Sequence, residues 1–240
     1  MSRLGLTGRH RHHALQVCVG ADSTFRLRAE ARDPWQTFGA AMVEAEVAHQ
    51  FDGADGLCAM LYLEPDLSSE RTDSENSGST ISAVQDIRLE AFRAEMTTVS
   101  AEGFAPDAVR GLHRRMRAIA GWERPEKGTV DSHIEHLLQL MRDSPAQPWS
   151  LEDTAVALQL STSRVRHLFV AETGTTLRRY RRWIRLEAAL RVLVGRESLT
   201  TAAHAAGFAD SAHLSRAFRE MFGLTPSGVT GAARILVDPE

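Results

Sequence analysis

The sequence predicts an α+β protein of two domains: a small antiparallel β-barrel with accompanying helices, followed by an all-α domain. Apolar residues alternate with polar ones between residues 15 and 63, which indicates strands. After residue 80 apolar residues recur at spacings of three and four, which indicates helices. Within residues 150–226 one helix-turn-helix pattern occurs twice. A chain of 240 residues is long enough for two such domains.

The predicted barrel covers residues 1–65. The segments LQVCV, FRLR and LCAMLYL each alternate, and Leu57, Ala59, Leu61 and Leu63 share one face of the last segment. Residues 66–80 contain few apolar side chains, so we expect a flexible loop there.

Residues 81–120 are predicted to form two helices. One apolar stripe contains Val84, Ile87, Ala91, Phe92, Met96 and Val99, and the other contains Val109, Leu112, Met116 and Ile119. This spacing fits helices that pack on the strands and equally a short dimerisation seam, so both alternatives stay open. Residues 121–130 hold a proline and two glycines and are predicted to be a linker.

The repeat lies in the predicted all-α domain, residues 131–230. Ser150 aligns with Ser198, and Gly174 aligns with Gly223. Each copy is expected to begin at a serine N-cap and to end at a C-terminal glycine. In the second copy, Gly207 is expected to supply the turn between the two helices.

A single linker helix is predicted between the two copies, over residues 176–194. Such a helix would be about 28 Å long. Because one turn of DNA spans about 34 Å, it could hold two recognition helices in successive major grooves.

Charge is distributed unevenly within a net charge of -3. Residues 150–226 contain 11 arginines and seven acidic residues, whereas residues 1–149 contain 16 basic and 22 acidic ones. In the last predicted helix, the arc opposite Leu214 and Phe218 carries Ser211, Ala212, His213, Arg216 and Arg219. A polyanionic partner is therefore expected for the C-terminal part.

The C-terminal part resembles the DNA-binding module of the AraC/XylS transcriptional regulators, from about Trp149 to Pro226. The segments LSTSRVRHLF, GTTLRRYRRWIRLEAAL and SLTTAAHAAGFADSAHLSRAFREMFGLTP carry the resemblance, in that order. It implies double-stranded DNA as the partner. The base-reading residues it implies are Ser163, Arg164, Arg166, His167, Ser211, Ala212, His213 and Arg216. Contacts to phosphate are expected from Arg178, Arg179, Arg182 and Arg219, although arginines of this run also fit a solvated helix face.

The N-terminal half is similar to cupin-like sensor barrels, in the segments TGRHRHHALQVCVG, AAMVEAEVAHQFDG and LCAMLYLEP. That likeness implies effector or metal binding by His10, His12, His13 and His49. An acid that would complete a catalytic metal set does not follow closely, because the next ones are Asp22 and Glu30. The histidines could equally line an effector pocket without binding metal.

The resulting functional prediction is a cytoplasmic transcriptional regulator, not an enzyme, with an N-terminal effector-sensing or dimerisation domain. No cofactor is predicted; a small-molecule effector or a metal ion stays open. We expect a homodimer, contact with RNA polymerase if the protein is an activator, and no membrane partner, because no apolar run approaches the roughly 20 residues of a membrane span. The alternatives are a cupin-type metal enzyme and a ligand-independent DNA-binding protein with the same module.

Overall fold

The structure is a computed structural model that describes residues 2–3, 5–54, 56–63, 81–121 and 131–228. The chain divides into two compact units, and the second contains Arg124–Ala217. The predicted loop at residues 66–80 lies outside the described residues, as does the predicted linker apart from Gly121. Each unit is described by itself.

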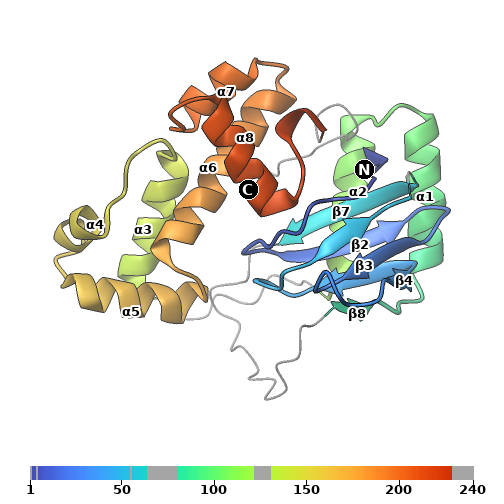
Figure 1. Ribbon diagram of the computed structural model, residues 1–240, viewed down its shortest axis with the longest axis horizontal. Coiled ribbons are helices and arrows are strands. Elements are labelled where there is room, and N and C mark those ends of the chain that lie inside the picture. Colours follow the sequence, from blue (N-terminus) through green and yellow to red (C-terminus); the bar gives the residue numbers. More distant parts are fainter. Residues whose placement is uncertain (1, 4, 55, 64–80, 122–130, 229–240) are drawn as a thin grey trace. The chain divides into compact units, whose positions relative to one another are not determined.

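The first unit contains two antiparallel sheets. The five-stranded sheet has the order β1-β7-β2-β5-β8, and the three-stranded sheet has the order β4-β3-β6 (Figure 1). The strands are β1 (Ser2–Arg3), β2 (Leu15–Gly20), β3 (Phe25–Arg28), β4 (Gln36–Phe38), β5 (Ala40–Val43), β6 (Gln50–Asp52), β7 (Leu57–Leu63) and β8 (Ile81–Ala83).

The prediction of a closed barrel is wrong, because both sheets are open. A closed barrel requires every strand to pair on both sides. Here β1 and β8 are the edge strands of the larger sheet, and they have only two and three residues. Outside the named strands, the described residues add only the single bridges Leu6↔Asp52 and His10↔His49. The larger sheet also takes β8 from beyond residue 65, the predicted end of the barrel.

The central strand β2 separates two apolar layers. Its residues Leu15, Val17 and Val19 pack with helices α1 (Leu89–Ala101) and α2 (Pro106–Ile119). Cys18 points the other way, into a layer that contains Phe25 and Phe51 of the smaller sheet. The first unit therefore has three layers, in the order helices, larger sheet and smaller sheet.

Helices α1 and α2 bury one face each against the larger sheet. The core that they share with β2 and β7 contains Phe92, Met96, Val99, Leu112, Met116 and Ile119. The dimerisation seam predicted for the same stripe stays a prediction. Ile87 was wrongly assigned to this stripe, since it precedes the first residue of α1 and is 96% exposed.

The second unit and the segment that follows it are helical. The helices are α3 (Ser132–Asp143), α4 (Leu151–Ala157), α5 (Thr162–Thr173), α6 (Leu177–Val194), α7 (Leu199–Ala205) and α8 (Ser211–Phe222). Within the part of the chain that the structure describes, no helix is both long and apolar enough to cross a membrane.

Side-chain oxygens cap these helices at their N-termini. Ser150 accepts from the amide of Asp153 at 2.9 Å, and Ser198 accepts from that of Thr201 at 3.0 Å, as the repeat predicts. Ser161 and Thr176 cap α5 and α6 in the same way. Each cap satisfies an amide that would otherwise lack a partner, and contributes about 1 kcal/mol.

Three glycines of the helical region end or join helices in the left-handed conformation. Gly174 follows α5 with φ of 67°, Gly207 lies between α7 and α8 with φ of 72°, and Gly223 follows α8 with φ of 70°. A Cβ at position 207 would also lie 2.8 Å from the backbone of Ala146. Next to this turn, Phe208 is buried, as expected for the core between the two helices.

Replacing Gly207 by alanine is expected to destabilise the second unit by about 1–3 kcal/mol, because the new Cβ is strained and meets backbone atoms. Gly111→Ala is the matched control. That glycine is inside α2 and its nearest neighbour, Glu95 Oε1, is 3.9 Å from the new Cβ, so we expect about 0.5–1 kcal/mol of stabilisation. Urea unfolding measures both changes. Equal stability of Gly207→Ala and the parent would contradict the account of the turn.

Candidate nucleic-acid interface

Helix α5, the second helix of the first copy, presents a polar face to solvent. Val165 and Phe169 are fully buried and anchor its inner face. On the remaining arc the structure exposes the four residues of α5 that were predicted to contact bases: Ser163, Arg164, Arg166 and His167. Because Ser161 caps the helix and fixes its first residue, these four residues fall on the exposed side of α5.

Helix α8 is the corresponding helix of the second copy. Asp210 accepts a hydrogen bond from the amide of His213 at 2.6 Å, which caps the helix start. Leu214 is buried, whereas Ala212, His213 and Arg216 are exposed and Ser211 is half-buried. The His213 ring lies edge-on to Phe208, with 5.2 Å between centroids. This contact orients the imidazole while leaving the residue exposed.

The arginine run of α6 separates into two groups with different surroundings. Arg178 and Arg179 are exposed in the first turn of the helix, and Arg182 is half-buried. Arg181 instead donates to the carbonyl of Trp149 at 2.6 Å. The sequence does not distinguish these residues, because they share one helical segment.

Arg185 joins α6 to the turn of the second copy. Its Nε donates to the carbonyl of Ala206 at 2.8 Å, and its guanidinium lies 4.4 Å from the centroid of the Phe208 ring. Burial, together with the charge of Arg181, lowers the pKa of Arg185. The hydrogen bond and the cation–π contact both hold the second helix-turn-helix copy on α6. Sequence reasoning missed this structural role.

The exposed arginines of α5 and α8 keep their donors available. Among the described residues, Arg164, Arg166 and Arg216 form no salt bridge, whereas Arg191 on α6 pairs with Glu187 at 2.5 Å. A guanidinium presents five N–H donors in a planar fork that matches phosphate oxygens or the O6 and N7 atoms of guanine. Arg219, toward the end of α8, is also exposed.

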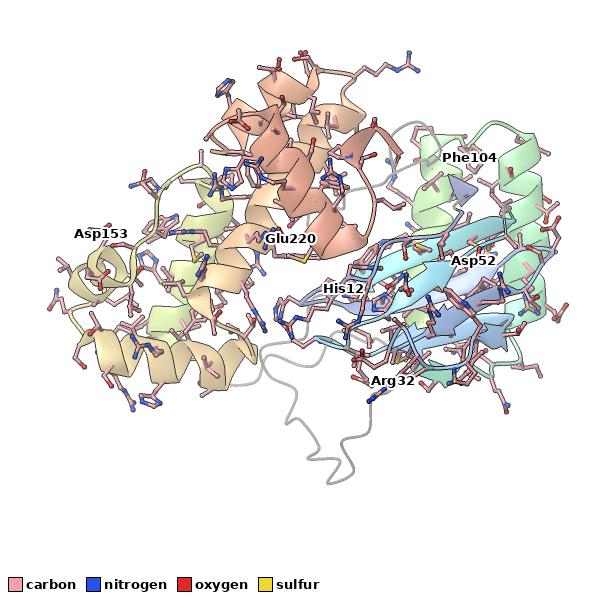
Figure 2. The ribbon with its side chains drawn as sticks, in the orientation of Figure 1. His12, Arg32, Asp52, Phe104, Asp153 and Glu220 are labelled. Carbon is pink, nitrogen blue, oxygen red and sulfur yellow. The ribbon has the colours of Figure 1, made fainter. Side chains whose placement is uncertain are left out.

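Three of the four predicted N-terminal histidines converge. One ring nitrogen from each of His10, His12 and His49 lies within 4.8 Å of the others, and all three residues are buried. His12 lies just before β2 (Figure 2). His13 is buried as well but is not part of this group. Gln16, which sequence reasoning overlooked, contacts both His12 and His49.

Burial keeps these imidazoles neutral. It lowers the pKa of His10 to about 4 and that of His49 to about 2, and it also lowers the pKa of His12. A positive charge on one ring would repel a charge on its neighbour, and this further lowers the pKa of His10 and that of His49. The first unit thus contains a buried cluster of uncharged nitrogen donors.

Comparison with known proteins places the helical region in a defined group. Residues 154–231 match a family model described as a helix-turn-helix domain. The HTH-type transcriptional regulator YidL of Escherichia coli (strain K12) is 37% identical over 58% of this chain and 50% of its own length. An AraC-like transcription regulator of Streptomyces lividans is 32% identical over 48% of this chain and 37% of its own length.

Two further comparisons extend over more of the chain. The transcriptional activator NphR of Rhodococcus sp is 29% identical over 76% of this chain and 48% of its own length. The chain thus spans between 37% and 50% of the length of these curated relatives. The crystal structure of ToxT from Vibrio cholerae O395 covers 95% of this chain and 93% of its own with a TM-score of 0.56 at 10% identity, which is a likeness of fold.

These matches assign residues 154–231 to the class of helix-turn-helix domains, and the curated proteins that share the region are transcription regulators. Within the chain, this region is similar to that of AraC-like transcription regulators.

Acid is expected to destabilise the first unit through its buried histidines. Between pH 6.5 and about 4, His10 binds a proton in the unfolded chain but not in the folded one. The free energy of unfolding therefore falls as the pH falls through this window, by up to about 1.4 kcal/mol per pH unit for one such group. Urea unfolding at pH 7.5 and pH 5 measures the difference, and His10→Gln should reduce it. The same pH dependence in both proteins would contradict this assignment.

Proposed function

We propose that this chain regulates transcription by binding double-stranded DNA through α5 and α8, which enter two successive segments of the major groove. The observation that carries the proposal is the repeated arrangement: each copy places a capped helix with an anchored apolar side and an exposed face of arginine and histidine. The similarity of this region to AraC-like transcription regulators supports the same partner.

The length of α6 supports binding of two adjacent segments by one chain. Its 18 residues correspond to about 27 Å. That length is comparable with one DNA turn of about 34 Å, so the two copies can face the same side of a duplex. The contacts of Arg185 with Ala206 and Phe208 make the second copy a rigid extension of α6.

We assign separate roles to the exposed side chains. Arg166 and Arg216 contact guanine, with Ser163, Arg164, His167, Ser211, Ala212 and His213 beside them at the base edges. Arg178, Arg179, Arg182 and Arg219 contact phosphates and position the domain without selecting sequence.

In this proposal, the first unit binds an effector and thereby regulates DNA binding. One solved structure of ToxT contains a bound unsaturated fatty acid, and NphR is named an activator. By analogy, an effector bound by the first unit changes how two copies of this chain pair on DNA. Pairing raises the effective concentration of the second DNA-binding domain at a neighbouring site. An activator of this kind then contacts RNA polymerase.

The base contacts predict position-specific effects on DNA binding. Selection from a genomic fragment library at two salt concentrations should give a motif with two elements about one DNA turn apart. Arg166→Ala should relax one element and Arg216→Ala the other, each weakening binding by about 1–3 kcal/mol.

The matched control is Arg191→Ala, which removes one positive charge from the same domain at a residue paired with Glu187. It should leave the selected motif unchanged. If binding by the parent protein shows no motif and disappears at moderate salt, the surface is only electrostatic and the proposal fails.

A phosphate contact predicts a different response. Arg178→Ala should weaken binding to all fragments alike and lower the slope of log affinity against log salt by about 1. The measurement is fluorescence anisotropy of one selected fragment and one scrambled fragment over a salt series. Loss of affinity for the selected fragment alone would instead make Arg178 a base contact.

A further inference from the structure

We propose that the buried ring of Phe208 determines sequence preference at one base pair of the second DNA element, because it fixes the direction of His213. Arg185 of helix α6 supports the ring. All three residues belong to the second unit. This role rests on the proposed DNA binding and deepens it, since it makes the two helix-turn-helix copies unequal in how strictly they select bases.

The turns of the two copies share one backbone arrangement. The amide of Leu160 donates to the carbonyl five residues earlier at 3.0 Å, and the amide of Phe208 does the same at 2.8 Å. The residue before each is left-handed, with φ of 54° at Gln159 and 72° at Gly207. Leu160 and Phe208 therefore occupy the same structural position, and one is aliphatic where the other is aromatic.

The first turn of α5 matches the first turn of α8 in the same way. Ser161 Oγ accepts from the amide of Arg164 at 3.2 Å, and Asp210 Oδ1 accepts from the amide of His213 at 2.6 Å. Arg164 and His213 thus each follow the cap by three residues, and both are exposed. At one place on the exposed arc, the first copy presents an arginine and the second presents a histidine.

A ring contact constrains the histidine and has no counterpart in the first copy. The ring centroids of Phe208 and His213 are 5.2 Å apart, with an interplanar angle of 88°. A T-shaped aromatic pair adds roughly a two- to tenfold preference for its own arrangement. Leu160 has no ring to offer Arg164, and an arginine has more rotatable side-chain bonds than a histidine. The imidazole is therefore directed before DNA binds, whereas the guanidinium is not.

Arg185 holds the Phe208 ring from helix α6. Its guanidinium carbon lies 4.4 Å from the ring centroid, and its Nε donates to the carbonyl of Ala206 at 2.8 Å. Phe208 is only 3% exposed, so its ring cannot turn without disturbing close-packed neighbours. Contacts thus lead from Arg185 through Phe208 to His213, and they connect the linker helix to a side chain on the exposed arc.

A side chain that is directed before binding discriminates more strictly between bases. A neutral imidazole offers one donor and one acceptor, and the base pairs differ in where they present donors and acceptors in the major groove. A mobile side chain can turn to meet several base edges, whereas a fixed ring meets one. The entropy of ordering the ring is also lost during folding and not during binding. His213 should therefore select one base pair more strictly than Arg164 does.

The test applies DNA selection to variants of the full-length protein. The base pair that His213 contacts is the motif position at which His213→Ala loses preference. Phe208→Leu, which introduces the residue of the first copy, should lower that preference by roughly three- to tenfold and leave the first element unchanged. In a His213→Ala background, Phe208→Leu should have no further effect at this position, because the ring acts through the imidazole.

Phe169→Leu is the matched control, because Phe169 is also fully buried but contacts Tyr180. It should lower stability and leave the preference at the His213 position unchanged. Arg185→Met keeps the ring but removes its support, and should lower the same preference by at least about twofold. Circular dichroism and urea unfolding check that each variant is folded.

A measurement without DNA separates the ring contact from the DNA binding. In protein labelled with carbon-13 at histidine Cε1, the His213 resonance, assigned by its loss in His213→Ala, should shift in Phe208→Leu because the neighbouring ring is gone. An unchanged resonance in folded Phe208→Leu would overturn the positioning role. So would equal weakening of binding to all sequences by Phe208→Leu in both backgrounds. If the parent protein selects no motif, the proposed DNA binding fails, and the role of Phe208 in base preference fails with it.

Discussion

The first unit depends on β2, a strand whose six residues are all buried. Because successive side chains of a strand point to opposite faces, β2 packs Leu15, Val17 and Val19 on the helices while Gln16 and Cys18 face the smaller sheet. A shift of one residue in its pairing with β5 or β7 would exchange these faces. The register of β2 therefore fixes both the core under the helices and the position of Gln16 beside the histidines.

The helical region uses a different principle to hold its functional side chains. Short helices such as α4 and α7 have too few residues to be stable alone, so their caps and packing determine where they begin and end. Ser161 and Asp210 set the starts of α5 and α8, and buried Val165 and Leu214 set their rotation. Once start and rotation are fixed, the exposed arc of each helix is fixed as well. The arginines thus need no contacts of their own to be directed outward.

Local features of the sequence predicted the helix-turn-helix region well. Serine caps, a left-handed glycine at Gly207 and the buried Phe208 depend on a few neighbouring residues, so a single sequence contains the necessary information. Closure of the barrel could not be predicted in the same way. It depends on whether edge strands pair over long separations, and here β1 and β8 are too short to do so. Ile87 illustrates a smaller error, because periodicity alone does not show that the helix begins two residues later.

The candidate site residues show the same contrast between local features, which the sequence predicts, and long-range contacts, which it does not predict. Exposure of Arg166 and Arg216 follows from helical periodicity, whereas the structural roles of Arg181 and Arg185 depend on carbonyls of Trp149 and Ala206. Among the N-terminal residues, the likeness to cupin-like barrels identified His10 and His12. The signal that identifies Gln16 was also present, since it shares strand parity with both and follows His12 by four positions. Gln16 was overlooked because an acidic residue was expected after His12, although an amide oxygen also donates a lone pair.

In the proposed complex, α5 and α8 of one chain occupy two successive major-groove segments. Hydroxyl-radical footprinting of the protein on a selected DNA fragment tests it most directly, because the protection pattern reports groove position at single-nucleotide spacing. The account predicts two protected segments on one face of the duplex, with centres about 10 base pairs apart for each bound chain. A single protected segment per chain, or uniform protection along the fragment, would contradict it.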